Sequence, residues 1–146
     1  MLSIGILRCL PHILEPGESV ESLSLGAGNT GRDFDLETNQ RVAEFKFIRW
    51  RGGAETIRQN AVFKDFFQLA EHATDKRRLL YVLGTKYPLA FLTSDRAISS
   101  VLNRNVRLLS QFRAQYPDLN TVAEYFATRK DCVSIEDVSP WLPELG

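Results

Sequence analysis

The chain has 146 residues, 44% of them hydrophobic, and its 18 Lys and Arg residues balance its 18 Asp and Glu residues. This length and composition predict a single globular domain over residues 1–146, because such a chain can bury a substantial core. They exclude a membrane-spanning protein, since no apolar run approaches about 18 residues. Cys9 and Cys132 lie far apart in sequence, and we expect both to be reduced thiols rather than zinc ligands.

Residues 1–14 are apolar but lack the basic start and the small-residue cleavage site of a signal peptide. We therefore interpret them as a short helix or strand that covers the core, and we expect a cytoplasmic protein. Pro11 and Pro16 interrupt this part of the chain, so no long helix is expected before residue 20.

A glycine-rich segment, Gly26 to Gly31, follows the strand-like residues 22–25 and fits the pattern G-x-G-x-x-G. A dinucleotide site requires such a loop to open a helix whose N-terminus binds the pyrophosphate. The residues that follow alternate as a strand instead. We interpret the segment as a hairpin loop that could lie against a nucleic-acid backbone.

The next two segments, residues 32–38 and 41–50, have the alternating pattern of strands and predict an antiparallel hairpin that turns at Asn39 and Gln40. Alternation gives the second strand two different faces. One face holds Val42, Glu44, Lys46, Ile48 and Trp50, and the other holds Ala43, Phe45 and Phe47. A carboxylate and an ammonium group therefore lie side by side on a face that is otherwise apolar.

The register of this hairpin places like charges opposite one another. It pairs Glu37 with Val42, Asp35 with Glu44 and Asp33 with Lys46. Opposed residues have Cβ atoms about 4.5–5.5 Å apart, and like charges so placed are destabilising. Ionised groups are also costly to bury unless they are paired or bind a metal. The pattern therefore predicts a cation between Asp35 and Glu44.

Asp35 followed by Glu44-x-Lys46 on a hairpin resembles the PD-(D/E)XK superfamily of metal-dependent nucleases, over roughly residues 15–95. The resemblance implies a restriction-endonuclease-like fold. It implies that Asp35, Glu44 and the carbonyl group of Phe45 hold Mg²⁺ or Mn²⁺, and that Lys46 positions and activates the attacking water.

The sequence departs from that pattern at two points. No proline precedes Asp33 or Asp35, so either could be the first ligand, although the hairpin register favours Asp35. Many members also carry a Glu on a first helix, and the candidates here are Glu15, Glu18 and Glu21.

Residues 54–73 show helical periodicity after the glycines that end the strand. The apolar stripe comprises Val62, Phe66, Leu69, Ala70 and Ala73. Gln59, four residues before Phe63, resembles the Gln-x-x-x-Tyr element of recombination-type members of the superfamily, which implies that Gln59 helps to organise the site. The alternative is a polar residue of the first turn that is half exposed.

Further along the chain, the apolar run from Arg78 to Thr85 predicts a buried strand. Ser94 and Asp95 offer an N-cap for one long helix to about Tyr116, whose buried face includes Asn105. A shorter helix is expected over residues 119–129, followed by a brief strand and an irregular tail. Together these elements predict an α/β or α+β fold with a central mixed sheet, an antiparallel hairpin and flanking helices.

The basic residues are concentrated in the middle of the chain. Residues 41–113 hold 14 Lys and Arg against 6 Asp and Glu, whereas residues 1–40 and residues 114–146 each hold 2 against 6. The side chains that could meet phosphates are Arg49, Arg51, Arg58, Lys64, Arg104 and Arg107, although a solvated helix face is the alternative for Arg104 and Arg107.

The sequence thus indicates a Mg²⁺-dependent nuclease-like domain that hydrolyses phosphodiester bonds, with DNA expected in preference to RNA. The alternative from another class is a non-catalytic module that binds nucleic acid or a protein partner through the same fold. A third possibility is a fragment or subunit whose missing N-terminal helix is supplied by a partner. The assemblies that we expect are a homodimer or a complex with a partner subunit.

Overall fold

Five strands form one mixed sheet in the order β1-β2-β3-β4-β5, within the residues that the computed structural model describes, 2–24, 34–47, 50 and 56–143. The strands are β1 (Val20–Leu23), β2 (Leu36–Thr38), β3 (Arg41–Lys46), β4 (Arg77–Val82) and β5 (Ser134–Asp137). The helices are α1 (Leu2–Ile13), α2 (Thr56–Glu71), α3 (Lys86–Leu92), α4 (Ile98–Val101), α5 (Val106–Gln115) and α6 (Val122–Arg129), with a short 3₁₀ helix, η1 (Ser139–Trp141). The predicted fold class, a mixed sheet flanked by helices, is confirmed.

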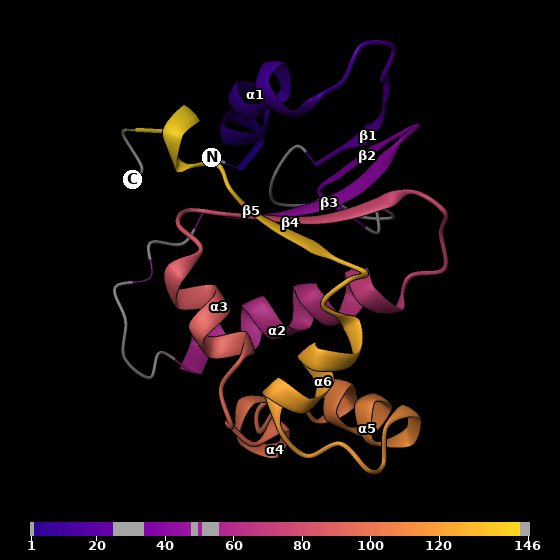
Figure 1. Cartoon of the computed structure of the whole chain (residues 1–146), viewed down its shortest axis with the longest axis vertical. Helices are drawn as coiled ribbons and strands as arrows, with labels where there is room; N and C mark the ends of the chain where they lie inside the picture. Colours follow the sequence, from indigo (N-terminus) through magenta and orange to yellow (C-terminus); the bar gives the residue numbers. More distant parts are fainter. Residues whose placement is uncertain (1, 25–33, 48–49, 51–55, 144–146) are drawn as a thin grey trace.

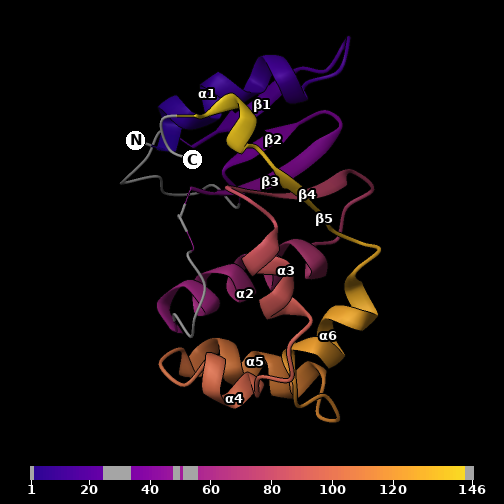
Figure 2. The same cartoon turned by 60° about the vertical axis from the view of Figure 1, so that its left-hand side comes forward.

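The sheet separates two layers of helix. Figure 1 shows α1 on one face and α2 with α3 on the other, and Figure 2 shows α4, α5 and α6 as a further layer beyond α2. Two apolar clusters correspond to these faces. The cluster on the α1 side includes Ile6, Cys9, Leu36, Ala43, Phe45, Leu79 and Tyr81. The larger cluster on the α2 side includes Val42, Val62, Phe63, Phe66, Phe67, Leu80, Phe112 and Tyr125.

The hairpin has the register that the sequence predicts. Strands β1, β2 and β3 are antiparallel, and Glu37 pairs with Val42 as expected. Asn39 and Gln40 form the connection, and the Thr38 hydroxyl oxygen accepts hydrogen bonds from the backbone N–H groups of Gln40 and Arg41. Strand β3 then pairs in parallel with β4 through the crossover helix α2, so β3 lies in the middle of the sheet.

A buried ion pair fixes the α1 side of this hairpin. The Arg41 guanidinium donates to both carboxylate oxygens of Glu18, at 2.6 and 2.9 Å, and to the hydroxyl oxygen of Tyr81 at 2.9 Å. Thr38 also donates to Glu18. Burial acts to raise the pKa of Glu18, but the hydrogen bonds from Arg41 and Thr38 outweigh it and lower that pKa to about 2. Both charges are therefore satisfied.

A second polar cluster holds the distal helices to α2. Glu71, at the end of α2, accepts hydrogen bonds from the hydroxyl groups of Tyr116 and Tyr125 and from the guanidinium of Arg129. Thr121 begins α6 with a capping box, in which Thr121 and Glu124 bond to each other's backbone N–H groups. These contacts fix α5 and α6 against α2, the helix that carries part of the site described below.

The structure corrects several predicted boundaries. Helix α1 has 12 residues despite Pro11, whereas no long helix was expected before residue 20. Pro11 lies in the last turn, where a missing N–H removes a single hydrogen bond. Glu15, Glu18 and Glu21 all follow α1, so none of them lies on a first helix. Strand β3 ends at Lys46 rather than at residue 50, and β4 ends at Val82 rather than at Thr85.

The predicted single helix from residue 94 to Tyr116 is also wrong. The chain forms α4 and α5 with a break between them, because the Asn105 side chain accepts a hydrogen bond from the N–H group of Leu108 and caps α5. The Ser94 hydroxyl bonds back to the carbonyl oxygen of Phe91, at the end of α3, a helix that was not predicted.

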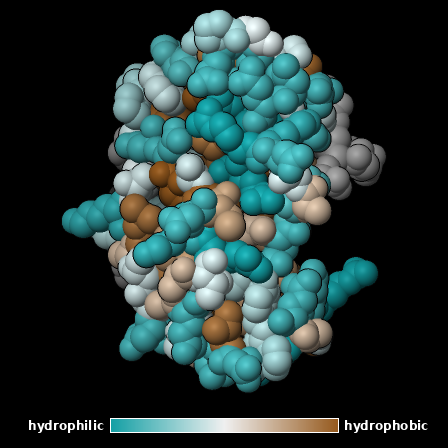
Figure 3. Space-filling model, turned by 45° about the vertical axis from the view of Figure 1, so that its right-hand side comes forward, coloured by the Kyte–Doolittle hydropathy of each residue, from teal (hydrophilic) through white to brown (hydrophobic). Residues whose placement is uncertain are grey.

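The surface in Figure 3 is largely hydrophilic, with apolar residues in small groups among polar ones. None of the described helices combines the length and the apolar composition needed to cross a bilayer. Cys9 and Cys132 are both free thiols, as expected. The glycine-rich segment Gly26 to Gly31 lies outside the described residues.

The buried ion pair makes a prediction about stability. We expect Glu18→Gln to lower the free energy of unfolding by about 3 kcal/mol at pH 7, because it leaves Arg41 buried without its anion. The pKa of Glu18 is depressed from 4.5 to about 2, so its stabilisation is present above pH 4.5 and is lost as the pH falls through 2. Urea denaturation of both proteins should therefore show a penalty that shrinks as the pH falls from 4.5 towards 2.

Glu15→Gln is the matched control, since Glu15 is exposed and lies 3.7 Å from Arg77. It should cost less than about 1 kcal/mol. A Glu18→Gln penalty that is equally small at pH 7, or that does not change with pH, would contradict this role of the pair.

Candidate functional site

The end of the hairpin brings Asp35 and Glu44 together. A carboxylate oxygen of Glu44 accepts a hydrogen bond from the backbone N–H group of Asp35, at 3.1 Å. In return, a carboxylate oxygen of Asp35 accepts one from the backbone N–H group of Phe45, at 2.9 Å. Asp35 lies one residue before β2. Its side chain therefore bonds to β3 just beyond the point where the backbone pairing of β2 with β3 ends. The two acids that the sequence places opposite each other are therefore in contact across the hairpin.

Glu44 occupies an unusual place for a carboxyl group. It lies in the middle strand of the sheet, paired with Leu80 of β4, and only 8% of its surface is exposed. Burial, together with the nearby charges of Asp65 and Asp35, raises the pKa of Glu44 to about 9. In the absence of a further cation, this residue carries a proton at neutral pH.

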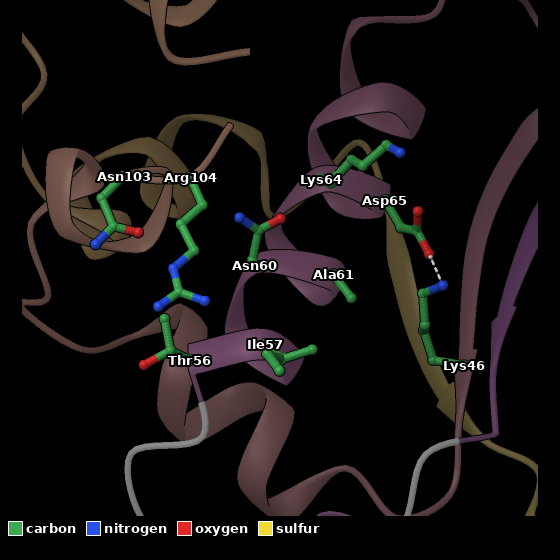
Figure 4. A pocket seen from close by; sticks show the side chains of 9 residues that line it. All are labelled: Lys46, Thr56, Ile57, Asn60, Ala61, Lys64, Asp65, Asn103 and Arg104. Atoms are coloured by element: carbon green, nitrogen blue, oxygen red, sulfur yellow. Dashed lines mark ion pairs between the residues drawn. The ribbon is translucent and has the colours of Figure 1, made fainter. Parts of the chain in front are cut away.

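Lys46 projects from the same face of β3 towards α2. Its ammonium group forms an ion pair with the carboxylate of Asp65 at 2.8 Å (Figure 4). Burial acts against the charged form of Lys46, but Asp65, Glu44 and Asp35 outweigh it and raise the pKa of the ammonium group. Lys46 is therefore a fixed cation and not a general base.

Asp65 is the residue that the sequence analysis missed. It is only 5% exposed, and burial raises the pKa of its carboxyl group, an effect that Lys46 partly offsets. Its Oδ2 atom is shielded from solvent and, apart from the ion pair, has no hydrogen-bond partner among the described residues. A signal was present in the sequence, because Asp65 lies between Val62 and Phe66 on the buried stripe of α2.

The four groups together have an imbalance of charge. Three carboxyl groups, from Asp35, Glu44 and Asp65, interact with one another and with the ammonium group of Lys46, and Asp65 is also influenced by the charge of Lys64. Buried carboxylates need partners, so this cluster requires either bound protons or another cation. We call Asp35, Glu44, Lys46 and Asp65 the acidic cluster.

The acidic cluster opens into a groove of about 520 Å³ that runs along the first half of α2 (Figure 4). One side consists of Thr56, Ile57, Asn60 and Lys64 of α2, and the opposite side consists of Asn103 and Arg104 between α4 and α5. The two sides are tied together by Asn60, whose amide group donates a hydrogen bond to the carbonyl oxygen of Val101. Lys46 and Asp65 line the groove at the β3 side.

The remaining predicted residues lie in different places. Gln59 is on α2 but buried, with 5% exposure, and its carbonyl oxygen has no hydrogen-bond partner among the described residues. Of the two interpretations of Gln59, the alternative of a half-exposed polar residue is therefore wrong, and the role in organising the site stays a prediction. The Phe45 side chain packs on the α1 side of the sheet against Tyr81. Lys64 lines the groove, and Arg58 is half-buried on α2.

Some expectations fall on residues outside the described ranges. These are the nucleic-acid contacts of Arg49 and Arg51, and the alternative first ligand Asp33. The predicted pairing of Asp33 with Lys46 also lies outside the described residues, and the described partner of Lys46 is Asp65.

The donors of the acidic cluster are oxygen atoms, the type that Mg²⁺ and Mn²⁺ prefer. Within the described residues, however, no three His, Cys, Asp or Glu side chains are placed so that they could hold one metal ion together. Among the described side chains, a cation could therefore be held by two carboxylates at most, with the other positions left to water or to a ligand.

Comparisons with known proteins return no match: no family model, no curated sequence and no solved structure is significantly similar to this chain. The chemistry of the acidic cluster and its groove is therefore the basis for assigning a function.

The buried carboxyl group of Glu44 predicts a specific dependence of stability on pH. The pKa of Glu44 rises from 4.5 to about 9 on folding, so its contribution is fully present below pH 4.5 and is lost as the pH rises through 9. Glu44→Gln mimics the protonated form. In the presence of EDTA, we expect the free energy of unfolding of this variant to exceed that of the natural chain above pH 9, by on the order of a few kcal/mol.

Urea denaturation between pH 5 and pH 10 measures this difference, which should be small at the acidic end. If the free energies of unfolding of the two proteins change with pH in the same way, Glu44 is not the group that titrates.

Proposed function

We propose that this chain is a metal-dependent nuclease domain that hydrolyses phosphodiester bonds in nucleic acid, with DNA in preference to RNA. The observation that carries the proposal is the acidic cluster, in which the buried carboxyl groups of Glu44 and Asp65 and the half-buried one of Asp35 surround the ammonium group of Lys46 beside a cationic groove. The resemblance of Asp35, Glu44 and Lys46 to the PD-(D/E)XK motif supports the same function, as does the position of these residues on a hairpin of a mixed sheet.

Asp35 and Glu44 are the residues that would hold Mg²⁺ or Mn²⁺. Each carboxylate bonds to the backbone of the opposite strand segment, the two interact electrostatically, and their combined negative charge favours a cation over a proton once one is available. Two protein carboxylates are sufficient, because Mg²⁺ is usually bound through one or two carboxylates and completes its shell with water and substrate phosphate oxygens. The carbonyl group of Phe45 is proposed as a further ligand, on the resemblance alone.

When bound, the ion would act as a Lewis acid on the phosphodiester and lower the pKa of a coordinated water. Lys46 supplies a fixed positive charge next to that position, and its raised pKa keeps it protonated. An ammonium group can hold the attacking water by a hydrogen bond and stabilise the negative charge that develops on the phosphate. Asp65 acts through Lys46, since its carboxylate fixes the position of the ammonium group.

A module that binds nucleic acid without cutting it would use the same groove. The observation that favours this second candidate is the ion pair between Lys46 and Asp65, because it balances the positive charge that would stabilise the reacting phosphate. The two candidate functions differ in whether they depend on a metal ion. We place either function in the cytoplasm, in keeping with the sequence.

A thermal-shift experiment tests the metal site. Mg²⁺ or Mn²⁺ should raise the melting temperature, because a ligand that binds only the folded state stabilises it. Asp35→Asn and Glu44→Gln should each reduce the shift between metal and EDTA. Glu37→Gln is the control, since Glu37 lies on the same hairpin but pairs with Lys76 outside the acidic cluster. A shift that is unchanged in both site variants would show that metal binds elsewhere.

A cleavage assay on single-stranded DNA, duplex DNA and RNA tests the activity. We expect Mg²⁺-dependent cleavage that falls roughly 10²–10³-fold in Lys46→Ala, in line with the loss of one charge-stabilising donor. Lys46→Ala leaves Asp65 buried without its cation, so Lys46→Ala/Asp65→Asn serves as a second variant if the first is unstable. No cleavage by the natural chain with either metal, together with retained binding, would favour the binding module over the enzyme.

A further inference from the structure

The groove beside the acidic cluster has features that indicate the physical form of its ligand. Its volume of about 520 Å³ is in the range of ligand-binding sites. It is lined by cations, carboxamides, a hydroxyl group, the carboxylate of Asp65 and two apolar side chains, Ile57 and Ala61, from three segments of the chain. We propose that this groove binds single-stranded nucleic acid, with Lys64 and Arg104 contacting phosphates and Ile57 contacting the face of a base. The inference rests on the proposed function, and it adds the strandedness of the substrate and the residues that select it.

The cations of the groove are available to an external anion. Within the described part of the chain, neither Lys64 nor Arg104 forms an ion pair, although Asp65 exerts an electrostatic effect on Lys64. Some cations elsewhere are neutralised, as where Lys76 pairs with Glu21 and Glu37, whereas Arg113 and Lys130 are exposed and form no ion pair among the described residues. Figure 4 shows Arg104 reaching across towards the first turn of α2, while Lys64 lies further along the helix. A phosphodiester backbone would meet positive charge on both sides of the groove.

Ile57 is the feature that distinguishes a single strand from a duplex. It is 81% exposed, the highest value among the large apolar side chains of the described residues, and it lines the groove between the cations. In a duplex the faces of the bases are stacked and covered, whereas a single strand presents them to the protein. Proteins that bind single strands combine a cationic groove with aromatic side chains that stack on base faces. Ile57 offers an apolar contact of this kind without an aromatic ring, about two helical turns before Lys64 on α2.

The two carboxamides add polar contacts that a nucleic-acid strand can use. Asn103 is exposed at the groove, and Asn60 is held by its bond to Val101. Asn side chains donate to phosphate oxygens and also bond to base edges. A strand lying along α2 would therefore pass from Arg104 and Asn103 to Lys64, and its backbone would reach Lys46 and Asp65 at the β3 side.

Fluorescence anisotropy in EDTA tests the proposal without cleavage. The probes are a labelled single-stranded DNA oligonucleotide of mixed sequence and the same oligonucleotide annealed to its complement. We expect the single strand to bind more tightly than the duplex. Lys64→Ala/Arg104→Ala should weaken single-strand binding on the order of tenfold and reduce the slope of log K against log salt by about 0.7 for each cation removed. Arg113→Ala/Lys130→Ala, which removes two exposed cations that do not line the groove, should leave both values unchanged.

Ile57→Gln tests the apolar contact. It should weaken single-strand binding with no change in the salt slope, because no ionic contact is lost, and it should leave duplex binding unaltered. Tighter binding of the duplex than of the single strand, or equal losses in the groove variant and its control, would overturn the proposal. Cleavage that persists while the groove variants bind normally would overturn this inference alone. Groove-dependent binding without any cleavage would support it and contradict the proposed enzyme.

Discussion

The ion pair between Lys46 and Asp65 is the interaction on which the site depends. It joins the end of β3 to the middle of α2 on a largely apolar face of the sheet that also carries Glu44. Without it, Lys46 would have no described anion in contact, and Asp65 would be a buried carboxylate with no partner. The pair also fixes the position of the Lys46 ammonium group, because Asp65 holds that group at the β3 side of the groove.

Strand β3 carries buried charged residues on both of its faces. The two groups differ in how well their charges are balanced, and this difference distinguishes a structural role from a functional one. On the α1 side, Arg41 and Glu18 form a balanced pair that satisfies its hydrogen bonds and lowers the pKa of the acid. On the α2 side, Glu44 has a raised pKa and shares one cation with two other acids. A pair with both charges satisfied is fully explained by its contribution to stability. An unsatisfied cluster costs stability, and strongly perturbed pKa values beside a groove are typical of functional sites.

The sequence was sufficient to predict the hairpin, because alternation of side chains and a two-residue turn determine which residues face each other. The contact between Asp35 and Glu44 follows from that register, and so does their position on the face that carries Lys46. Helix α2 and the parallel strand β4 were recognisable from periodicity and from a continuous apolar run. These features are local, so the residues that determine them lie close together in the sequence.

Other features depend on distant contacts and were not predictable in this way. Asp65 becomes part of the site only because the crossover lays α2 against β3. The break between α4 and α5 arises because Asn105 caps a helix instead of continuing one. Helix α3 follows β4 after a short connection and has no strong start signal, since Thr85 makes no side-chain capping bond. The groove joins α2 to residues 103–104, and no pattern in either segment indicates the other.

The most direct test of the account is a crystal structure with Mn²⁺, using the anomalous signal of the metal to locate it. The account predicts a peak between the carboxylates of Asp35 and Glu44, with Lys46 still close enough to hold a water at the same place. A peak elsewhere, or none at a Mn²⁺ concentration that saturates the thermal shift, would contradict the claim that the excess charge of the acidic cluster binds a cation.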